Sequence, residues 1–182
     1  MTANEFLHHC LGDFKSLRDR AMGLAESLGP EQLQWRPDPK RWSAGQICDH
    51  LIVSGQPYEA KIAPYITGPL AKPGTEFAMS FMGKLIARAA GPNSNAPVPP
   101  VFMPRPGPTP PDIAHQLVAH LDRMIALTEA AMGKDLGAKV SSPASRLVKL
   151  SVGDVFRVTA EHNLRHIGQI EDLVMTPGFP AK

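Results

Sequence analysis

Four long stretches of the sequence place apolar residues at intervals of three and four, which is the spacing of one buried face of an α-helix. Alternating runs of β-branched residues, which would indicate strands, are nearly absent. A chain of 182 residues is long enough to bury several such faces in one hydrophobic core. The sequence therefore predicts an all-α fold, a four-helix bundle in a single domain (1–182), with long helices over 4–28, 43–67, 109–133 and 151–175.

Local signals indicate where the long helices begin. Ser43 with Gln46 three residues later has the pattern of a capping box, in which the two side chains satisfy free backbone N–H groups. Ser151 is the expected cap of the fourth long helix, with Asp154 at the third helical position. Thr109 is the expected cap of the third long helix, because a proline follows it at the first helical position.

The longest break in the helical pattern is rich in proline. Nine of the 19 prolines fall in residues 91–111, so this segment is neither a helix nor a central strand. We expect an extended connection there, preceded by a short extra helix within 75–90. Pro57 lies inside the second long stretch and predicts a kink in that helix.

Composition excludes several classes of protein. The net charge is only +2, and the basic residues are scattered, which argues against a nucleic-acid partner. No apolar run is long enough to span a bilayer, and the first residues do not resemble a secretory signal. The two cysteines, Cys10 and Cys48, have no metal-binding spacing and are expected to be buried thiols. These features predict a cytoplasmic protein without a membrane partner.

His162 and His166 are the first candidates for a functional site. They lie one turn apart on the last helix, about 40° around its axis, on the stripe that faces the core. Thr159 and Gln169 share that stripe. A single buried histidine is usually a core residue with a hydrogen-bond partner, but two on one apolar stripe can both reach one metal ion.

His50 strengthens the prediction of a metal site. It lies on the inward face of the second long helix, so three imidazoles from two helices converge. Three nitrogen ligands leave coordination positions open, as in catalytic metal sites. We expect zinc, with nickel or iron as alternatives that the ligand type does not exclude. Gln169, Thr159 and Tyr58 are candidates to orient a ligand or support a histidine ring.

Other site types lack the residues that they need. Asn163 follows His162 where a zinc peptidase has its general base, a glutamate. No phosphate-binding loop, dinucleotide motif or nucleophile elbow is present, and no convincing general base stands out. The remaining histidines, His8, His9, His115 and His120, are expected at the surface or in incidental positions.

Three stretches together resemble the DinB/YfiT-like family of metal-dependent enzymes: residues 33–51, 142–154 and 160–170. The resemblance implies an up-down-down-up four-helix bundle, which is often dimeric, and a metal site formed by His50, His162 and His166. Relatives include S-transferases and an isomerase that use low-molecular-weight thiols such as bacillithiol or mycothiol. The sequence departs from the short family pattern in the segment 91–111 and at Pro57.

The leading hypothesis is a metal-dependent enzyme that activates a metal-bound water or a thiol for attack on a small electrophilic substrate. It would act as a hydrolase or as a thiol S-transferase with a low-molecular-weight thiol cosubstrate, and as a homodimer. The alternative is a non-catalytic metal-binding bundle that acts in binding or dimerisation. Metal binding is common to both hypotheses.

Overall fold

The computed structural model describes residues 1–94 and 96–181 and confirms the predicted all-α class. The described chain forms six α-helices, one short 3₁₀ helix and a two-stranded hairpin: α1 (Ala3–Ser27), α2 (Pro30–Gln34), α3 (Ala44–Ile66), α4 (Phe81–Ala90), η1 (Pro100–Phe102), α5 (Ile113–Ala130), β1 (Lys139–Ser141), β2 (Lys149–Ser151) and α6 (Val152–Val174). None of the helices in this part of the chain combines the length and the apolar character that crossing a membrane requires.

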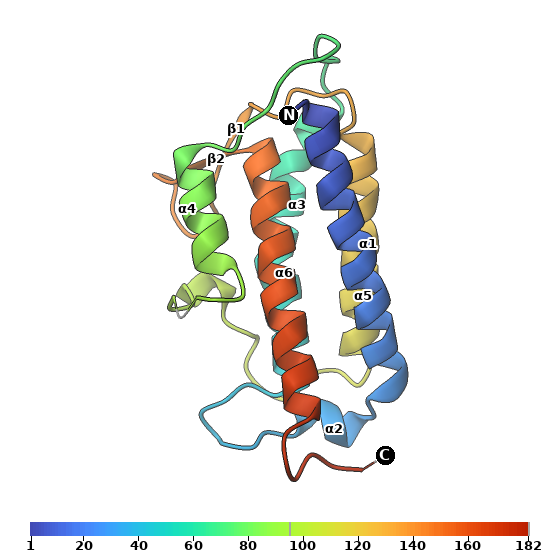
Figure 1. Cartoon of the computed structure of the whole chain (residues 1–182). Helices are drawn as coiled ribbons and strands as arrows, with labels where there is room; N and C mark the ends of the chain where they lie inside the picture. Colours follow the sequence, from blue (N-terminus) through green and yellow to red (C-terminus); the bar gives the residue numbers. More distant parts are fainter. Residues whose placement is uncertain (95, 182) are drawn as a thin grey trace.

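The four long helices lie side by side (Figure 1). α1 packs against α5 and α6, and α3 packs against the same two helices from the other side. Following the colours along the chain, α1 and α6 run in one direction and α3 and α5 in the opposite one. Each long helix therefore has two long neighbours, and its inner face is closed off from water.

The core is built from the apolar faces that the sequence pattern marks. Among its largest fully buried side chains are Phe14 and Leu17 from α1, Leu51 from α3, Leu121 from α5 and Phe156 from α6. Burying one such side chain contributes about 1.5–3 kcal/mol to the free energy of unfolding. One continuous apolar cluster joins all four long helices, so they are stabilised as a unit.

The capping predictions for the second and fourth long helices are confirmed. The Ser43 side chain accepts a hydrogen bond from the backbone N–H of Gln46, and Ser151 does the same for Asp154. In return, the Gln46 side chain accepts a hydrogen bond from the backbone N–H of Ser43, and the Asp154 carboxylate accepts one from that of Ser151. Helices α3 and α6, which carry the three candidate histidines, thus start at fixed residues.

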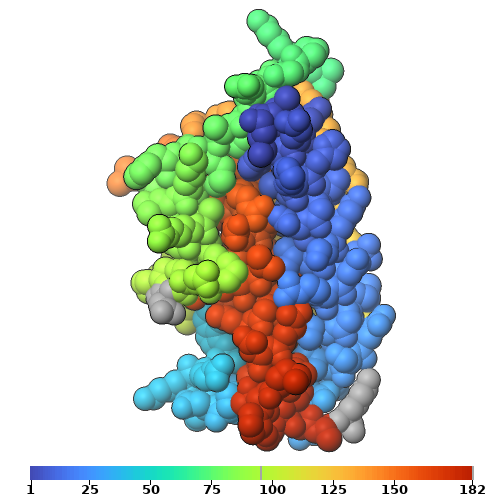
Figure 2. All heavy atoms as spheres, in the orientation of Figure 1, coloured from blue at the N-terminus to red at the C-terminus, as the bar shows by residue number. Residues whose placement is uncertain are grey.

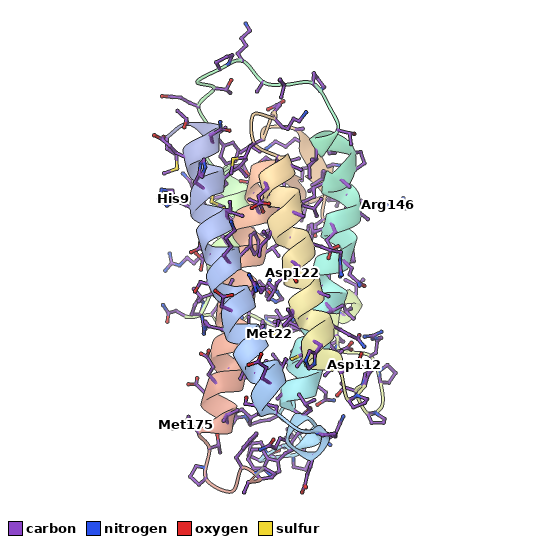
Figure 3. All side chains as sticks on the ribbon, turned by 90° about the vertical axis from the view of Figure 1, so that its right-hand side faces the viewer. His9, Met22, Asp112, Asp122, Arg146 and Met175 are labelled. Carbon is purple, nitrogen blue, oxygen red and sulfur yellow. The ribbon has the colours of Figure 1, made fainter. Side chains whose placement is uncertain are left out.

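The predicted start of the third long helix is wrong. The helix begins at Ile113 after Asp112, not after Thr109 (Figure 3). Thr109 is buried, and its hydroxyl accepts a hydrogen bond from the Gln34 side chain of α2, at 2.9 Å. A tertiary contact therefore uses the group that local sequence would assign to capping.

The described part of the proline-rich segment 91–111 has no α-helix or strand and consists of η1, turns, bends and irregular chain; residue 95 within it lies outside the described residues. Arg105 holds the segment against α3, because its backbone N–H and its guanidinium both donate to the buried carboxylate of Asp49. The preceding helix, α4, packs along α6, as the space-filling view shows (Figure 2). The expected short helix within 75–90 is confirmed, with a later start at Phe81.

Candidate metal centre

Three imidazoles come together between α3 and α6, as the sequence predicts. The ring centroids of His50, His162 and His166 are 4.6 to 4.8 Å apart in every pairing. One nitrogen from each ring lies within 4.8 Å of the other two, so the three residues could hold a metal ion. His162 and His166 meet because they are one helical turn apart, and His50 reaches them because α3 packs on α6.

Hydrogen bonds fix two of the rings and determine which nitrogen carries the hydrogen. Nδ1 of His50 lies 2.6 Å from the carbonyl oxygen of Phe102, and Nδ1 of His166 lies 2.7 Å from Oε1 of Gln169. Both oxygens can only accept, so each ring donates from Nδ1. Each neutral ring then has its lone pair on Nε2, the atom turned toward the cluster.

The donor set fits a divalent metal. Nε2 of His50 and Nε2 of His162 are 3.0 Å apart. Two nitrogens bound to one zinc ion at about 2.0–2.1 Å lie roughly 3 to 3.5 Å from each other, because their bonds diverge from a shared centre. Imidazole lone pairs gathered this closely in a buried site need a shared proton or cation between them.

Burial keeps the three rings neutral at neutral pH. It lowers the pKa of His50, against the opposing effect of the hydrogen bond to Phe102. Burial also lowers the pKa of His166 to about 3. The pKa of His162 falls well below 6.5, because of burial first and the neighbouring His166 and His50 rings second. Neutral rings are the form that binds a metal ion.

The three supporting residues expected from the sequence have different surroundings. Gln169 contacts the cluster directly through its bond to His166. Tyr58 lines the adjacent pocket, but its hydroxyl pairs with Ser142 at 3.0 Å. Thr159 also lines the pocket, and its backbone carbonyl accepts a hydrogen bond from the Asn163 side chain.

A pocket of about 210 Å³ opens beside the histidines, between α3, α4 and α6. Its outer wall comes from the proline-rich segment, through residues such as Pro97, Val98 and Phe102. On another side of the histidines, the Trp42 ring lies 4.8 Å from the ring centroid of His50. The cluster is therefore shielded by apolar groups and faces a cavity that can take a small molecule.

Sequence analysis missed three residues that shape this site. Phe102 supplies a backbone carbonyl, which no side-chain pattern reveals. Asn163 and Arg165 line the pocket between the two histidines of α6. Their position in the stretch His162-Asn-Leu-Arg-His166 was a usable signal, because residues adjacent to two ligands lie near the same site.

Of the two expectations for His120, a surface or an incidental position, the structure excludes the surface. Its side chain is fully buried between α3 and α5, with Nδ1 bonded to the carboxylate of Glu59, which also accepts from Arg123. The helical period places His120 inward beside Leu121, and Glu59 on α3 supplies the partner. His8, His9 and His115 are exposed as expected, and Figure 3 shows His9 at the edge of α1.

The cysteines are buried and unpaired, as predicted. Burial raises the pKa of the thiols of Cys10 and Cys48 to about 12 in both cases. At neutral pH they are protonated, which is the unreactive form. They therefore act as small core residues and not as nucleophiles.

Comparison with known proteins agrees with this arrangement. A family model described as the DinB superfamily matches residues 13–170, which include all three histidines and the proline-rich segment. No match was found among curated proteins or among solved structures. The family match covers most of the chain, and the chain therefore belongs to the DinB superfamily.

Proposed function

We propose that the protein is a metal-dependent enzyme in which His50, His162 and His166 hold one divalent ion. Zinc is the expected metal, with nickel or iron as alternatives. The observation that carries the proposal is the fixed orientation of the rings, since acceptors at both Nδ1 atoms leave the Nε2 lone pairs of His50 and His166 facing the cluster. When bound, such a metal supplies Lewis-acid chemistry and lowers the pKa of a coordinated water or thiol.

The reaction class is attack on a small electrophilic substrate, by water in a hydrolase or by a low-molecular-weight thiol in an S-transferase. The chain itself contributes orientation and exclusion of water. Phe102 and Gln169 hold two imidazoles in place. The proline-rich segment covers one side of the pocket and the Trp42 ring lies beside His50, so both limit the access of bulk water, which strengthens electrostatic interactions at the histidines.

The same proposal includes the topology of the family. The order of contacts among the four long helices, and the directions visible in Figure 1, support an up-down-down-up four-helix bundle. The single apolar cluster, which extends from Ala3 to Leu173, supports one folding domain for the chain.

The test is metal content. Purified protein is incubated with zinc, nickel or iron(II), desalted and measured by elemental analysis. We expect close to one equivalent in the wild type and in His115→Ala, an exposed histidine that serves as the matched control. His162→Ala should lose most of the bound metal, because two nitrogen ligands hold an ion far less tightly than three. Equal metal content in both variants would overturn the proposal.

One observation favours the non-catalytic alternative. No carboxylate side chain lines the pocket among the residues that the structure describes, so no aspartate or glutamate is placed there to act as a general base. Turnover separates the two functions. Hydrolysis or thiol transfer that disappears in His162→Ala supports the enzyme, whereas a metal-dependent rise in melting temperature without turnover of any electrophile tried supports the binding role.

A further inference from the structure

The pocket beside the histidines is apolar and contains one permanent positive charge. Its walls carry alanine, proline, valine and isoleucine side chains from α4, α6 and the proline-rich segment. Arg165 is the only arginine, lysine, aspartate or glutamate among the described residues that line it. A cation in an apolar pocket attracts an anion more strongly than one in water does.

Arg165 has no acidic partner in the described part of the chain. Its Nε atom is buried and makes no hydrogen bond. Glu161, one turn earlier on α6 and the nearest candidate along the helix, is instead paired with Arg157 at 2.6 Å. A guanidinium is always charged, so its buried Nε–H favours the approach of an acceptor atom, above all an anionic one.

Asn163 gives a second, independent indication. Its side chain is 1% exposed and lines the same pocket. The amide nitrogen donates to the Thr159 carbonyl at 2.8 Å, which settles the orientation of the amide. Oδ1 is then left buried without a partner. A buried acceptor without a donor is unfavourable, so this position favours a ligand that brings an N–H or O–H group.

We propose that the pocket binds a small organic carboxylate with an apolar body and one hydrogen-bond donor. The carboxylate pairs with Arg165, the donor meets Oδ1 of Asn163, and the body contacts the walls near Ile86 and Val98. The proposal rests on the proposed function in one respect: the ligand lies beside the three imidazoles and is therefore the substrate or cosubstrate of the metal site.

The test compares octanoate with 1-octanol, which has the same apolar chain and no charge. Binding is measured by calorimetry in protein treated with a chelator and in protein loaded with zinc. In both forms we expect the wild type to bind octanoate about tenfold more tightly than 1-octanol, as a charge-assisted hydrogen bond in an apolar site provides. 2-Hydroxyoctanoate, which adds a donor, should bind more tightly still, and Asn163→Leu should remove that increment.

In the chelated protein, Arg165→Met should lower the affinity for octanoate to that for 1-octanol, and leave the affinity for 1-octanol unchanged. The matched control is Arg146→Met, at an exposed arginine remote in sequence from the pocket residues (Figure 3). If Arg165→Met does not fold, the salt dependence of binding to the wild type serves as the test. The affinity for octanoate should fall between about 20 mM and about 500 mM NaCl while that for 1-octanol does not.

Equal affinity of the chelated wild type for octanoate and 1-octanol, or an equal loss of both in Arg165→Met, would overturn the proposal. This test can fail or succeed independently of the test for metal binding. Chelated protein that prefers octanoate through Arg165 supports this ligand class even if no metal ever binds, and metal binding without that preference supports the proposed function alone.

Discussion

The Nδ1 atom of His50 donates to a carbonyl oxygen that lies 52 residues further along the chain. Gln169 performs the same task for His166 from only three residues away. Acceptors of this kind hold an imidazole in one orientation and make its other nitrogen a better ligand. The strength of the metal site therefore depends on groups that do not touch the metal.

Gln169→Leu tests this dependence. The variant keeps the size of the side chain and removes the acceptor for His166, so the ring is free to turn and to change tautomer. We expect metal affinity to fall by about 10- to 100-fold, with the fold retained. Competition with a chromophoric chelator measures the affinity. Gln56→Leu, at an exposed position of α3, should match the wild type, and a Gln169→Leu value that also matches it would contradict the argument.

Glu59 provides a prediction about pH. Burial raises the pKa of this carboxyl, but the hydrogen bonds from His120 and Arg123 lower it by more, so the pKa lies below its ordinary value. Folding therefore gains stability above the unfolded pKa of about 4.3, and loses it as the pH falls through the lowered value. Glu59→Gln should reduce the free energy of unfolding at pH 7 by about 1–3 kcal/mol, because bonds to a charged group are lost.

Urea unfolding at several pH values measures this effect. The difference between wild type and Glu59→Gln should shrink as the wild-type carboxyl becomes protonated in acid. Glu129→Gln is the control, because its ion pair with Lys15 is half-exposed and contributes little. A difference that stays constant from pH 7 to pH 3 would show that packing, and not the charge, explains the loss.

At the scale of elements, the contact between α3 and α5 depends on the absence of a side chain. A Cβ at Gly55 would lie 2.4 Å from two ring atoms of His120, a distance that no real Cβ tolerates. His120 is held by Glu59 and is fully buried, so it has no room to withdraw. Gly55 therefore sets how closely the two helices approach.

Gly55→Ala should lower the free energy of unfolding by about 1–3 kcal/mol, as overpacked core positions do. Gly23→Ala is the matched control, because Gly23 lies within α1 and a Cβ there would meet nothing within 4 Å. That control should be stabilised by up to about 1 kcal/mol through helix propensity. Thermal unfolding measures both, and the argument fails if the two variants shift in the same direction.

The helices could be predicted where the local sequence decides the outcome. Ser43 and Ser151 cap as expected, because the partner side chain lies three residues away. Thr109 does not cap α5, because its hydroxyl accepts a hydrogen bond from the Gln34 side chain of α2, and the local sequence does not reveal that contact. The hairpin of β1 and β2 was also missed, since strands of three residues are too short to show alternation.

Of the candidate site, the sequence revealed the ligand set and not its surroundings. His50, His162 and His166 could be placed together because each lies on an inward helical face. The position of the pocket wall could not be predicted, since a proline-rich segment has no periodic pattern of apolar residues that would show where it packs. The acceptor from Phe102 and the anchor between Asp49 and Arg105 exist only after that packing.

At the scale of the whole molecule, the segment 91–111 joins α4 to α5 across the site. Arg105 ties it to Asp49, whose carboxylate is 1% exposed. Arg105→Met would leave that buried charge with only a backbone N–H donor. We expect faster amide hydrogen exchange over residues 100–105 by about tenfold or more, since a charged hydrogen-bond pair is lost.

Hydrogen exchange with mass spectrometry measures this, and α1 should keep its wild-type rates in the same sample. Arg36→Met is the control, because Arg36 is exposed and its guanidinium donates to the Pro39 carbonyl in its own loop. Unchanged exchange over residues 100–105 would mean that proline stiffness, rather than the anchor, holds the segment in place.

The placement of the pocket wall has a consequence for how such a protein can diversify. The histidines lie on helices that are packed together in the shared core, while the outer wall of the cavity is the segment 91–111 that connects two helices. Insertions and exchanges in connections are tolerated far better than changes in packed helices. Replacing this connection between α4 and α5 by one of different length should alter which molecules fit the pocket and leave the three histidine ligands unchanged. Specificity and reactivity can therefore be selected separately.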